Sequence, residues 1–550
     1  MGPRCVRALL RRSCLAAYLL APACSLSGPV EERALSSLAP LDVGRSDSTP
    51  GKAGVSSGET PLDGVEAWPV PAASGPFLAP LKLASPVYAT PDKQAEKIGY
   101  LRIGARVARS DQPVSLRDCK EGWYALRPLG FICAGDDVTL ELDHPLARAI
   151  QKEPDRTRPM PYAYAFARAS APNYMRVPTR HEQFESELRL DRHLRSWHEL
   201  TEDWDALEVG ANDVPLAPSG LASGPIPGHA RPLGMSERFG GDGQDALPWW
   251  LEGGRQIPNF APLDVPPRAL FANRMQRHAG VALIGSFVAD EAAQKRRFAL
   301  STDGRLLPAD KLKADSGSPF HGEDLRSVGL PVAFGWKTGA SFWRLEAGRP
   351  RPAERLPQRQ FVPLTGTVRM HDGVRMVETR SGSWLRSEDV RVAAKPRELP
   401  WYASQERRWI DVSIVNQVLV LWEGDQPVYA TLVSTGKDGL GDPRTTLSTP
   451  LGVFRIQQKH VTTTMDSSAG DDEFELRDVP WVMYFSGGYA LHGASWHDDF
   501  GRMRSHGCVN LAPIDARYVF EWSTPVVPEH WHGTYASPSV GQGTILRIGR

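Results

Sequence analysis

The clearest hydrophobic pattern lies in the C-terminal part of the chain. After Trp401, short apolar runs of strand length are separated by turn residues such as Asn416-Gln417 and Gly424-Asp425. The runs lie at 410–414, 418–422, 428–433, 452–456, 481–485, 489–491 and 544–548. Runs of this length with turns between them indicate β-strands rather than helices. The pattern therefore predicts a mainly β domain over residues 405–550, which we expect to fold independently.

One helix interrupts this series of strands. Pro513 suits the first position of a helix, and Asp515 would face the helix dipole from the first turn. Ile514, Tyr518 and Trp522 recur at four-residue spacing and predict an apolar face. A short helix is thus expected near the end of the domain.

The upstream pattern is weaker and predicts several smaller parts. Residues 25–78 are rich in Gly, Ser, Pro, Ala and Asp, as expected of a flexible linker. Residues 79–142 alternate apolar runs with turns, as a small β-barrel does, whereas 143–268 form an irregular linking region. Residues 269–398 return to β-like runs that could form a second small barrel. The fold class is therefore mainly β and multidomain.

The first 24 residues predict export. Four arginines precede an apolar stretch at 13–23, which is too short to span a bilayer, so a signal peptide is favoured. Ala21-Pro22-Ala23 fits ordinary cleavage, whereas Cys24 followed by Ser25 resembles a bacterial lipobox. Both alternatives remain open, and we favour lipidation of Cys24. The expected location is the periplasm or cell envelope, with a lipid anchor in the membrane.

Charge and cysteine content narrow the function. The 64 Lys and Arg residues balance 64 Asp and Glu residues, which argues against a nucleic-acid partner. Three of the six cysteines lie within the first 24 residues. An oxidising compartment would pair two of the remaining three, and Cys119 and Cys133 are close in sequence. Cys508 is then a free thiol and a candidate reactive residue.

The surroundings of Cys508 suit a nucleophile. His492 ends an apolar run and is a candidate general base, sixteen residues before Cys508. Gly507 permits a sharp turn with amides facing an oxyanion, and His506 can donate a further hydrogen bond. We also expect the dipole of the following helix to favour a Cys508 thiolate.

These residues resemble the L,D-transpeptidase catalytic family (YkuD). The resemblance rests on His492-Gly493, on Ser505-His506-Gly507-Cys508 and on the upstream STPLGVFRI at 448–456, and it covers about 408–550. It implies that Cys508 attacks a peptidoglycan stem peptide, that His492 accepts the thiol proton, and that the backbone amides of 506–508 stabilise the oxyanion. It also implies transfer of the acyl group to an amine, 3→3 cross-linking, and no metal or organic cofactor.

Four further residues are predicted to bind the substrate, and the N-terminal region resembles a second family. We assign substrate binding to Ser505, Asn510, Tyr484 and Trp496; many family members carry Arg where this chain has Asn510. Residues 79–142 resemble a bacterial SH3-like domain through the VYATPD start and a G-x-L-x-x-G step, although another small β-barrel would fit. Expected partners are peptidoglycan stem peptides, with envelope proteins as further acyl acceptors.

Alternatives for the same residues remain. The fold could serve a thiol-dependent peptidoglycan hydrolase or carboxypeptidase, or a non-enzymatic wall-binding protein. Three histidines and Cys508 could bind zinc, but their spacing fits no common finger. We expect His497, with Asp498 and Asp499, on an exposed loop, and His530 and His532 on the surface of the tail.

Overall fold

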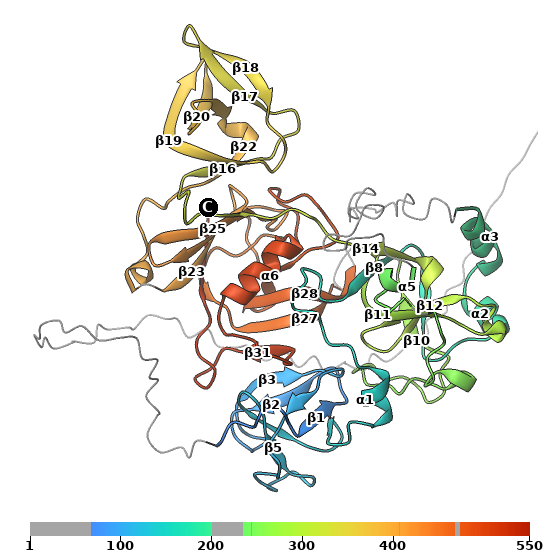
Figure 1. The fold of residues 1–550 in the computed structure, drawn as a ribbon. Coiled ribbons are helices and arrows are strands. Elements are labelled where there is room, and N and C mark those ends of the chain that lie inside the picture. The colour runs from blue at the N-terminus through green and yellow to red at the C-terminus, as the bar shows by residue number, and fades with distance from the viewer. Residues whose placement is uncertain (1–67, 201–234, 244, 406, 468–473) are drawn as a thin grey trace, which may run out of the picture. The chain divides into compact units, whose positions relative to one another are not determined.

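The computed structural model describes residues 68–200, 235–243, 245–405, 407–467 and 474–550. The predicted signal peptide, Cys24 and nearly all of the predicted linker lie outside these residues. Residues 67–550 form one compact unit, which is mainly β as predicted (Figure 1). Within the described part, no helix is long and apolar enough to span a membrane.

The predicted N-terminal barrel region consists of short strands. They are β1 (Phe77–Pro80), β2 (Ser85–Tyr88), β3 (Lys97–Leu101), β4 (Val107–Ala108), β5 (Trp123–Ala125), β6 (Phe131–Cys133) and β7 (Val138–Thr139). β1 begins inside the predicted linker, two residues before the expected boundary. Cys119 and Cys133, the pair predicted above, form a disulfide with a Cα–Cα distance of 5.8 Å. The SH3-like assignment of this region stays a prediction.

Residues 143–268 are not merely an irregular link, because two of their strands belong to a sheet. The strands β8 (Ala163–Ala167) and β9 (Ala171–Tyr174) pair with strands from the next predicted region, so the order is β10-β9-β13-β12-β11-β8-β14. The added strands are β10 (Phe271–Met275), β11 (Gly280–Val288), β12 (Arg297–Ser301), β13 (Leu306–Pro308) and β14 (Leu312–Asp315). The helices of this part are α1 (Pro145–Ala149), α2 (Arg180–Ser186), α3 (Leu190–Leu200) and α5 (Met235–Arg238). The boundary predicted at residue 269 therefore cuts through one sheet.

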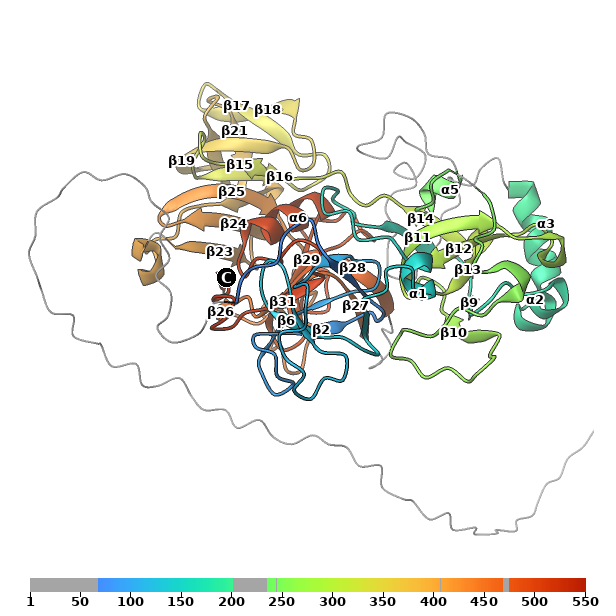
Figure 2. The ribbon, with the colours of Figure 1, turned by 60° about the horizontal axis from the view of Figure 1, so that its bottom comes forward.

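Residues 332–393 form a separate seven-stranded sheet, which we call the 332–393 sheet. Its order is β18-β17-β21-β20-β19-β16-β22, and its strands are antiparallel neighbours around their own buried core (Figure 2). Its strands are β16 (Val332–Gly335), β17 (Ser341–Glu346), β18 (Arg349–Arg355), β19 (Phe361–His371), β20 (Val374–Thr379), β21 (Trp384–Arg386) and β22 (Val390–Ala393). Short 3-10 helices lie at Glu252–Gly254, Glu291–Ala293, Ala309–Lys311, Ser387–Asp389 and Trp401–Gln405.

The C-terminal region contains two sheets and one helix. One sheet has the order β15-β25-β24-β23-β32-β26, with β15 (Glu323–Asp324), β23 (Arg408–Ser413), β24 (Val418–Glu423), β25 (Gln426–Leu432), β26 (Gly452–Arg455) and β32 (Ile545–Gly549). The other is a 16-stranded sheet shared with the upstream strands β3 and β11, to which this region contributes β27 (Gln458–Ser467), β28 (Phe474–Ser486), β29 (Tyr489–Gly493), β30 (Val509–Leu511) and β31 (Gly533–Tyr535). Helix α6 (Pro513–Trp522) packs on β28 and β29 (Figure 1).

Helix α6 is present as predicted, but its buried face differs from the expected one. Ala516, Val519 and Phe520 are fully buried, whereas Ile514 and Tyr518 are half-buried. Trp522 is buried at the end of the helix. The four-residue spacing had identified the helix but not the side that the sheet covers.

The C-terminal region is not a closed unit, contrary to our expectation. Its strand β31 pairs with β3, and Trp481 Nε1 donates a hydrogen bond to Pro159 O at 2.6 Å. The Arg102 guanidinium lies against the Asp478 carboxylate, with Nη2 2.9 Å from Oδ2, and both groups are buried. One continuous hydrophobic core includes Leu101 and Trp481. Residues far upstream of 405 therefore contribute to the stability of this region.

Candidate active site

The candidate base and nucleophile project from neighbouring strand ends. Strands β29 and β30 are parallel, and His492 is the register partner of Asn510. Cys508 comes one residue before β30, and its Sγ lies 3.7 Å from the carbonyl oxygen of Gly488, the residue before β29. Register partners share a face of a sheet, and side chains two residues apart return to that face. His492 and Cys508 are sixteen positions apart in the sequence, yet they belong to adjacent strands, with His492 on β29 and Cys508 directly before β30.

Burial keeps both groups uncharged at neutral pH. Burial lowers the pKa of His492 to about 4, although a hydrogen bond to the Gly493 carbonyl oxygen opposes this change. Burial raises the pKa of the Cys508 thiol to about 11, against the backbone N–H of Ala490, which favours the thiolate. His492 Nδ1 lies 3.2 Å from Gly493 O, which leaves Nε2 as the nitrogen that can accept a proton. This arrangement suits proton transfer during attack rather than a preformed thiolate.

The expected role of the helix dipole is wrong. Cys508 is followed by strand β30, and helix α6 begins five residues after it, at Pro513. The dipole effect falls off within the first turn of a helix, so it does not act directly on the thiol. The Ala490 amide is the backbone group that stabilises a thiolate here.

The rate of Cys508 acylation should therefore fall only at a lower pH than is usual for a reaction with a histidine base. A general base works only when unprotonated, and the lowered pKa of His492 keeps it unprotonated down to about pH 4. We expect the rate of Cys508 acylation to stay nearly level from pH 8 to about pH 5, then to fall. Stopped-flow acylation by a carbapenem, with circular dichroism as a folding control, measures this profile. A fall centred near pH 6.5, the ordinary histidine value, would contradict the buried, neutral base.

The turn before Cys508 is held by three hydroxyl and backbone contacts. The Ser505 hydroxyl accepts a hydrogen bond from Gly507 N at 3.1 Å and donates one to Cys508 O. Thr449 Oγ1 donates to Gly507 O at 2.8 Å. Ser505 is therefore a buried support of the turn rather than the substrate contact we predicted. Because the Gly507 amide already donates to Ser505, it is not a free oxyanion donor, and the Cys508 amide is the better candidate.

Gly507 is required by its backbone conformation. Its φ is +119°, and a Cβ placed there would lie 2.6 Å from Tyr489 Cε1. Gly507→Ala should destabilise the protein by about 1–3 kcal/mol from backbone strain, with the clash added, and should slow Cys508 acylation. Urea unfolding and acylation rates would measure both effects. The matched control is Gly488→Ala, since no atom lies within 4 Å of a Cβ at Gly488 and its φ is outside the left-handed region; equal effects of the two substitutions would contradict this account.

The predicted substrate contacts divide into two groups. Tyr484 and Trp496 pack with Cys508 around the apolar side chains of Val479 and Val482. Burial raises the pKa of Tyr484, and the negative charge of a Cys508 thiolate raises it further. Both aromatic residues are thus placed to contact an acyl group on the sulfur.

Asn510 lies in the interior. Its side chain is 3% exposed, and its Nδ2 lies 3.0 Å from Nε2 of His497. His497 is 0% exposed, so the expectation of an exposed loop is wrong for this residue. Burial and the nearby Arg504 hold the pKa of His497 well below its usual range. No pattern in the sequence indicated this pairing, because it depends on how the loop folds back against β30.

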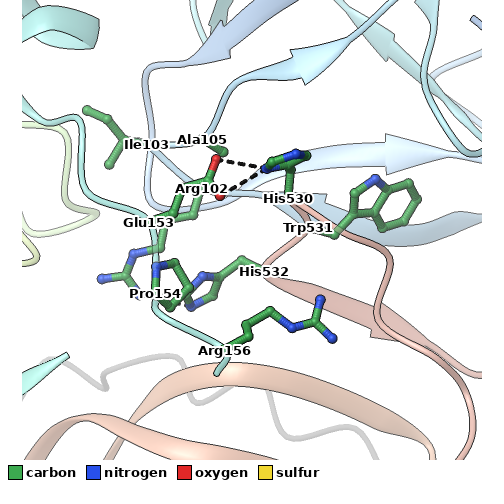
Figure 3. A pocket seen from close by; sticks show the side chains of 9 residues that line it. All are labelled: Arg102, Ile103, Ala105, Glu153, Pro154, Arg156, His530, Trp531 and His532. Atoms are coloured by element: carbon green, nitrogen blue, oxygen red, sulfur yellow. Dashed lines mark hydrogen bonds and ion pairs between the residues drawn. The ribbon is translucent and has the colours of Figure 1, made fainter. Parts of the chain in front are cut away.

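The other histidines have varied surroundings. His506 is exposed on the turn. His532 is buried against Thr462 and Arg102, contrary to our expectation, whereas His530 is partly exposed and pairs with Glu153 at 3.0 Å (Figure 3). Among the described residues, no group of three or more His, Cys, Asp or Glu side chains is arranged to hold a metal ion.

Comparison with known proteins finds a family match over the region that carries this site. Residues 407–538 match the L,D-transpeptidase catalytic domain (YkuD). Over 136 residues the chain is 28% identical to YciB of Bacillus subtilis (strain 168), which is named as a candidate L,D-transpeptidase. The aligned part is 23% of this chain and 64% of YciB, so the chain spans less than two thirds of that relative.

Two solved structures are among the structural matches. An L,D-transpeptidase mutant of Enterococcus faecium is 21% identical, with 26% of this chain and 50% of that chain covered and a TM-score of 0.20. An L,D-transpeptidase of Mycobacterium smegmatis is 15% identical, with 42% of this chain and 100% of that chain covered and a TM-score of 0.21.

Proposed function

We propose that this protein is an exported, cysteine-dependent L,D-transpeptidase that acts on peptidoglycan stem peptides. Cys508 Sγ attacks the carbonyl carbon of the third stem residue while His492 accepts the thiol proton. The C–N bond to the terminal D-Ala breaks, and His492 returns the proton to the leaving amine. The observation that carries the proposal is the placement of Cys508 and His492 on neighbouring strand ends within the matched catalytic domain.

The second half-reaction resolves the thioester. A side-chain amine of another stem attacks the acyl carbon, the C–S bond breaks, and His492 accepts the proton from the amine. The product is a 3→3 cross-link, and Cys508 regains its proton. Tyr484 and Trp496 border the sulfur on the side where acyl donor and acceptor would meet. Envelope proteins with an exposed amine are a second class of acceptor.

Export is a further part of the proposal. The Cys119–Cys133 disulfide supports it, because such bonds persist in oxidising compartments. We propose that a signal peptide directs export and that lipidation of Cys24 anchors the chain to the membrane. Metabolic labelling with a lipid precursor would test the anchor, since Cys24→Ser should lose the label.

Product analysis tests the reaction. Purified sacculi are incubated with the protein or with Cys508→Ala, digested with a muramidase, and analysed by mass spectrometry. We expect 3→3 cross-linked dimers and free D-Ala from the wild type only. Trimmed stems without dimers would instead indicate a hydrolase. Unchanged sacculi, with Cys508 intact and the protein folded, would support a wall-binding protein without enzymatic activity.

A further inference from the structure

The loop at 494–504 connects the candidate base to the turn that carries the nucleophile. Its Trp496 ring stacks on the His492 ring, with centroids 5.6 Å apart and an interplanar angle of 26°. Its His497 contacts Asn510, the register partner of His492. The position of this loop therefore determines what packs around the base.

Part of the support for the loop comes from the 332–393 sheet, which contributes none of the reacting groups. Arg359, between β18 and β19, donates from Nη1 to Asp498 Oδ1 at 2.6 Å and from Nη2 to Asp498 O. Arg391 on β22 donates from Nε to Gly501 O at 2.9 Å. Two residues that precede the sheet add contacts. Ser318 Oγ donates to Asp498 Oδ1, and the Phe320 ring stacks on Phe500 at 6.0 Å.

The Arg359–Asp498 pair is built more firmly than an ordinary surface ion pair. The two side chains are 25% and 16% exposed, and the guanidinium binds both the carboxylate and the backbone carbonyl of Asp498. Hydrogen bonds between charged groups of fixed geometry are stronger than neutral ones. Arg359 also adopts φ +63°, a conformation that residues other than glycine adopt rarely. Such backbone outliers persist where the surrounding structure holds them, and they cluster at functional sites.

We propose that Arg359 is a positioning residue for the reaction at Cys508. It holds Asp498, which fixes Trp496 and His497 against His492 and Asn510, and so makes the 332–393 sheet part of the catalytic apparatus. The proposal rests on the proposed function for its reaction, but the coupling itself concerns the environment of the Cys508–His492 pair. Small displacements of reacting groups cost about 10²-fold in rate. An effect of this size is expected without any contact between Arg359 and the substrate.

A double-mutant cycle in the full chain tests the coupling. The variants are Arg359→Ala, Asp498→Ala and their combination, with Arg359→Lys as the conservative variant. The matched control is Arg375→Ala, which removes an exposed arginine from β20 of the same sheet. Carbapenem acylation of Cys508 is followed at several concentrations, so that the maximal rate and the half-saturating concentration are obtained separately.

We expect each single alanine variant to lower the maximal rate by about 10–10²-fold with little change in half-saturation. The double variant should be no slower than the singles, because residues that act through one contact are not additive. Arg359→Lys should recover part of the rate, and Arg375→Ala should match the wild type. An unchanged rate in Arg359→Ala, or losses that multiply in the double variant, would overturn the proposal.

A second measurement separates this proposal from the proposed function. Alkylation of Cys508 by iodoacetamide depends on the surroundings of the thiol but needs no transpeptidase activity. If the wild type fails to react with the carbapenem, the proposed function is contradicted, and alkylation should still show the same pattern across the variants. Equal alkylation rates in all variants would overturn the positioning role. If Arg359→Ala fails to fold, Asp498→Ala and Arg359→Lys complete the comparison.

Discussion

His492→Ala is expected to slow acylation of Cys508 by about 10²–10⁴-fold at neutral pH, because the proton acceptor is lost. The pKa of the thiol should change little, since burial rather than a charged histidine sets it at about 11. Raising the pH should restore part of the rate by increasing the thiolate fraction. Acylation by a carbapenem and alkylation by iodoacetamide, both measured against pH, test the two statements.

His506→Ala is the matched control for this substitution. It removes the other histidine of the motif, two residues from Cys508, whose side chain is exposed. We expect a smaller loss, at most about 10²–10³-fold through the oxyanion, and an unchanged thiol titration. If His506→Ala shows the larger loss and His492→Ala the smaller one, the two roles are reversed.

Asp478→Asn is expected to destabilise the folded protein by about 3–5 kcal/mol, because it leaves the buried Arg102 guanidinium without its partner charge. Asp478 also accepts hydrogen bonds from Thr462 and Thr302. Asparagine suits the site sterically, since residue 478 has φ +56° and Asn tolerates this conformation. Arg102 from the N-terminal region and His532 from the C-terminal region also border the small cavity of Figure 3. Loss of the Asp478 carboxylate would therefore affect both of these regions.

The control for Asp478→Asn is Glu354→Gln, which removes the carboxylate of the exposed Arg344–Glu354 pair. Exposed ion pairs contribute about 0–1 kcal/mol. Urea unfolding at pH 7 compares the two variants. Arg102 holds the pKa of Asp478 well below its usual range. The ionised Asp478 carboxylate therefore stabilises the folded protein fully above about pH 4. This stabilisation is lost only as the pH falls further, towards the lowered pKa. If Asp478→Asn were as stable as the wild type, the claim that the buried Arg102–Asp478 pair stabilises the C-terminal region would be contradicted.

The sequence predicted the features that depend on local pattern. Apolar runs and turn residues indicated the strand series after Trp401, and Pro513 indicated α6. His492 and Cys508 could be singled out because a thiol nucleophile needs a base, and the fold places them on or beside adjacent strands. The Cys119–Cys133 pair followed from the small number of cysteines left after the signal region.

Features that depend on distant contacts could not be predicted. Tyr174 of β9 pairs with Phe271 of β10 across almost a hundred residues, so the local pattern of the intervening region predicts only an irregular link. His497 is polar and follows a turn-like stretch, yet the fold buries it against Asn510. Arg359 is one of many arginines, and only its approach to Asp498 distinguishes it.

Ser505 shows how a motif can mislead about roles. Its place beside His506 and Gly507 suggested a substrate contact, but its hydroxyl closes the turn on itself. Thr449 lies in the STPLGVFRI segment, which carried the family resemblance without any assigned role. The structure shows that its hydroxyl holds the Gly507 carbonyl. Hydrogen bonds of this kind within a turn produce no repeating pattern in the sequence, so they could not be predicted from it.

The central claim is that Cys508 forms a thioester with a stem peptide with His492 as the base. Intact-protein mass spectrometry after mixing with a synthetic stem tetrapeptide tests it most directly. The account predicts a rapid mass increase equal to the tetrapeptide minus D-Ala, located on the peptide that contains Cys508. The adduct should be absent in Cys508→Ala and slow to form in His492→Ala. An adduct on another residue, or D-Ala release that persists in Cys508→Ala, would contradict the account.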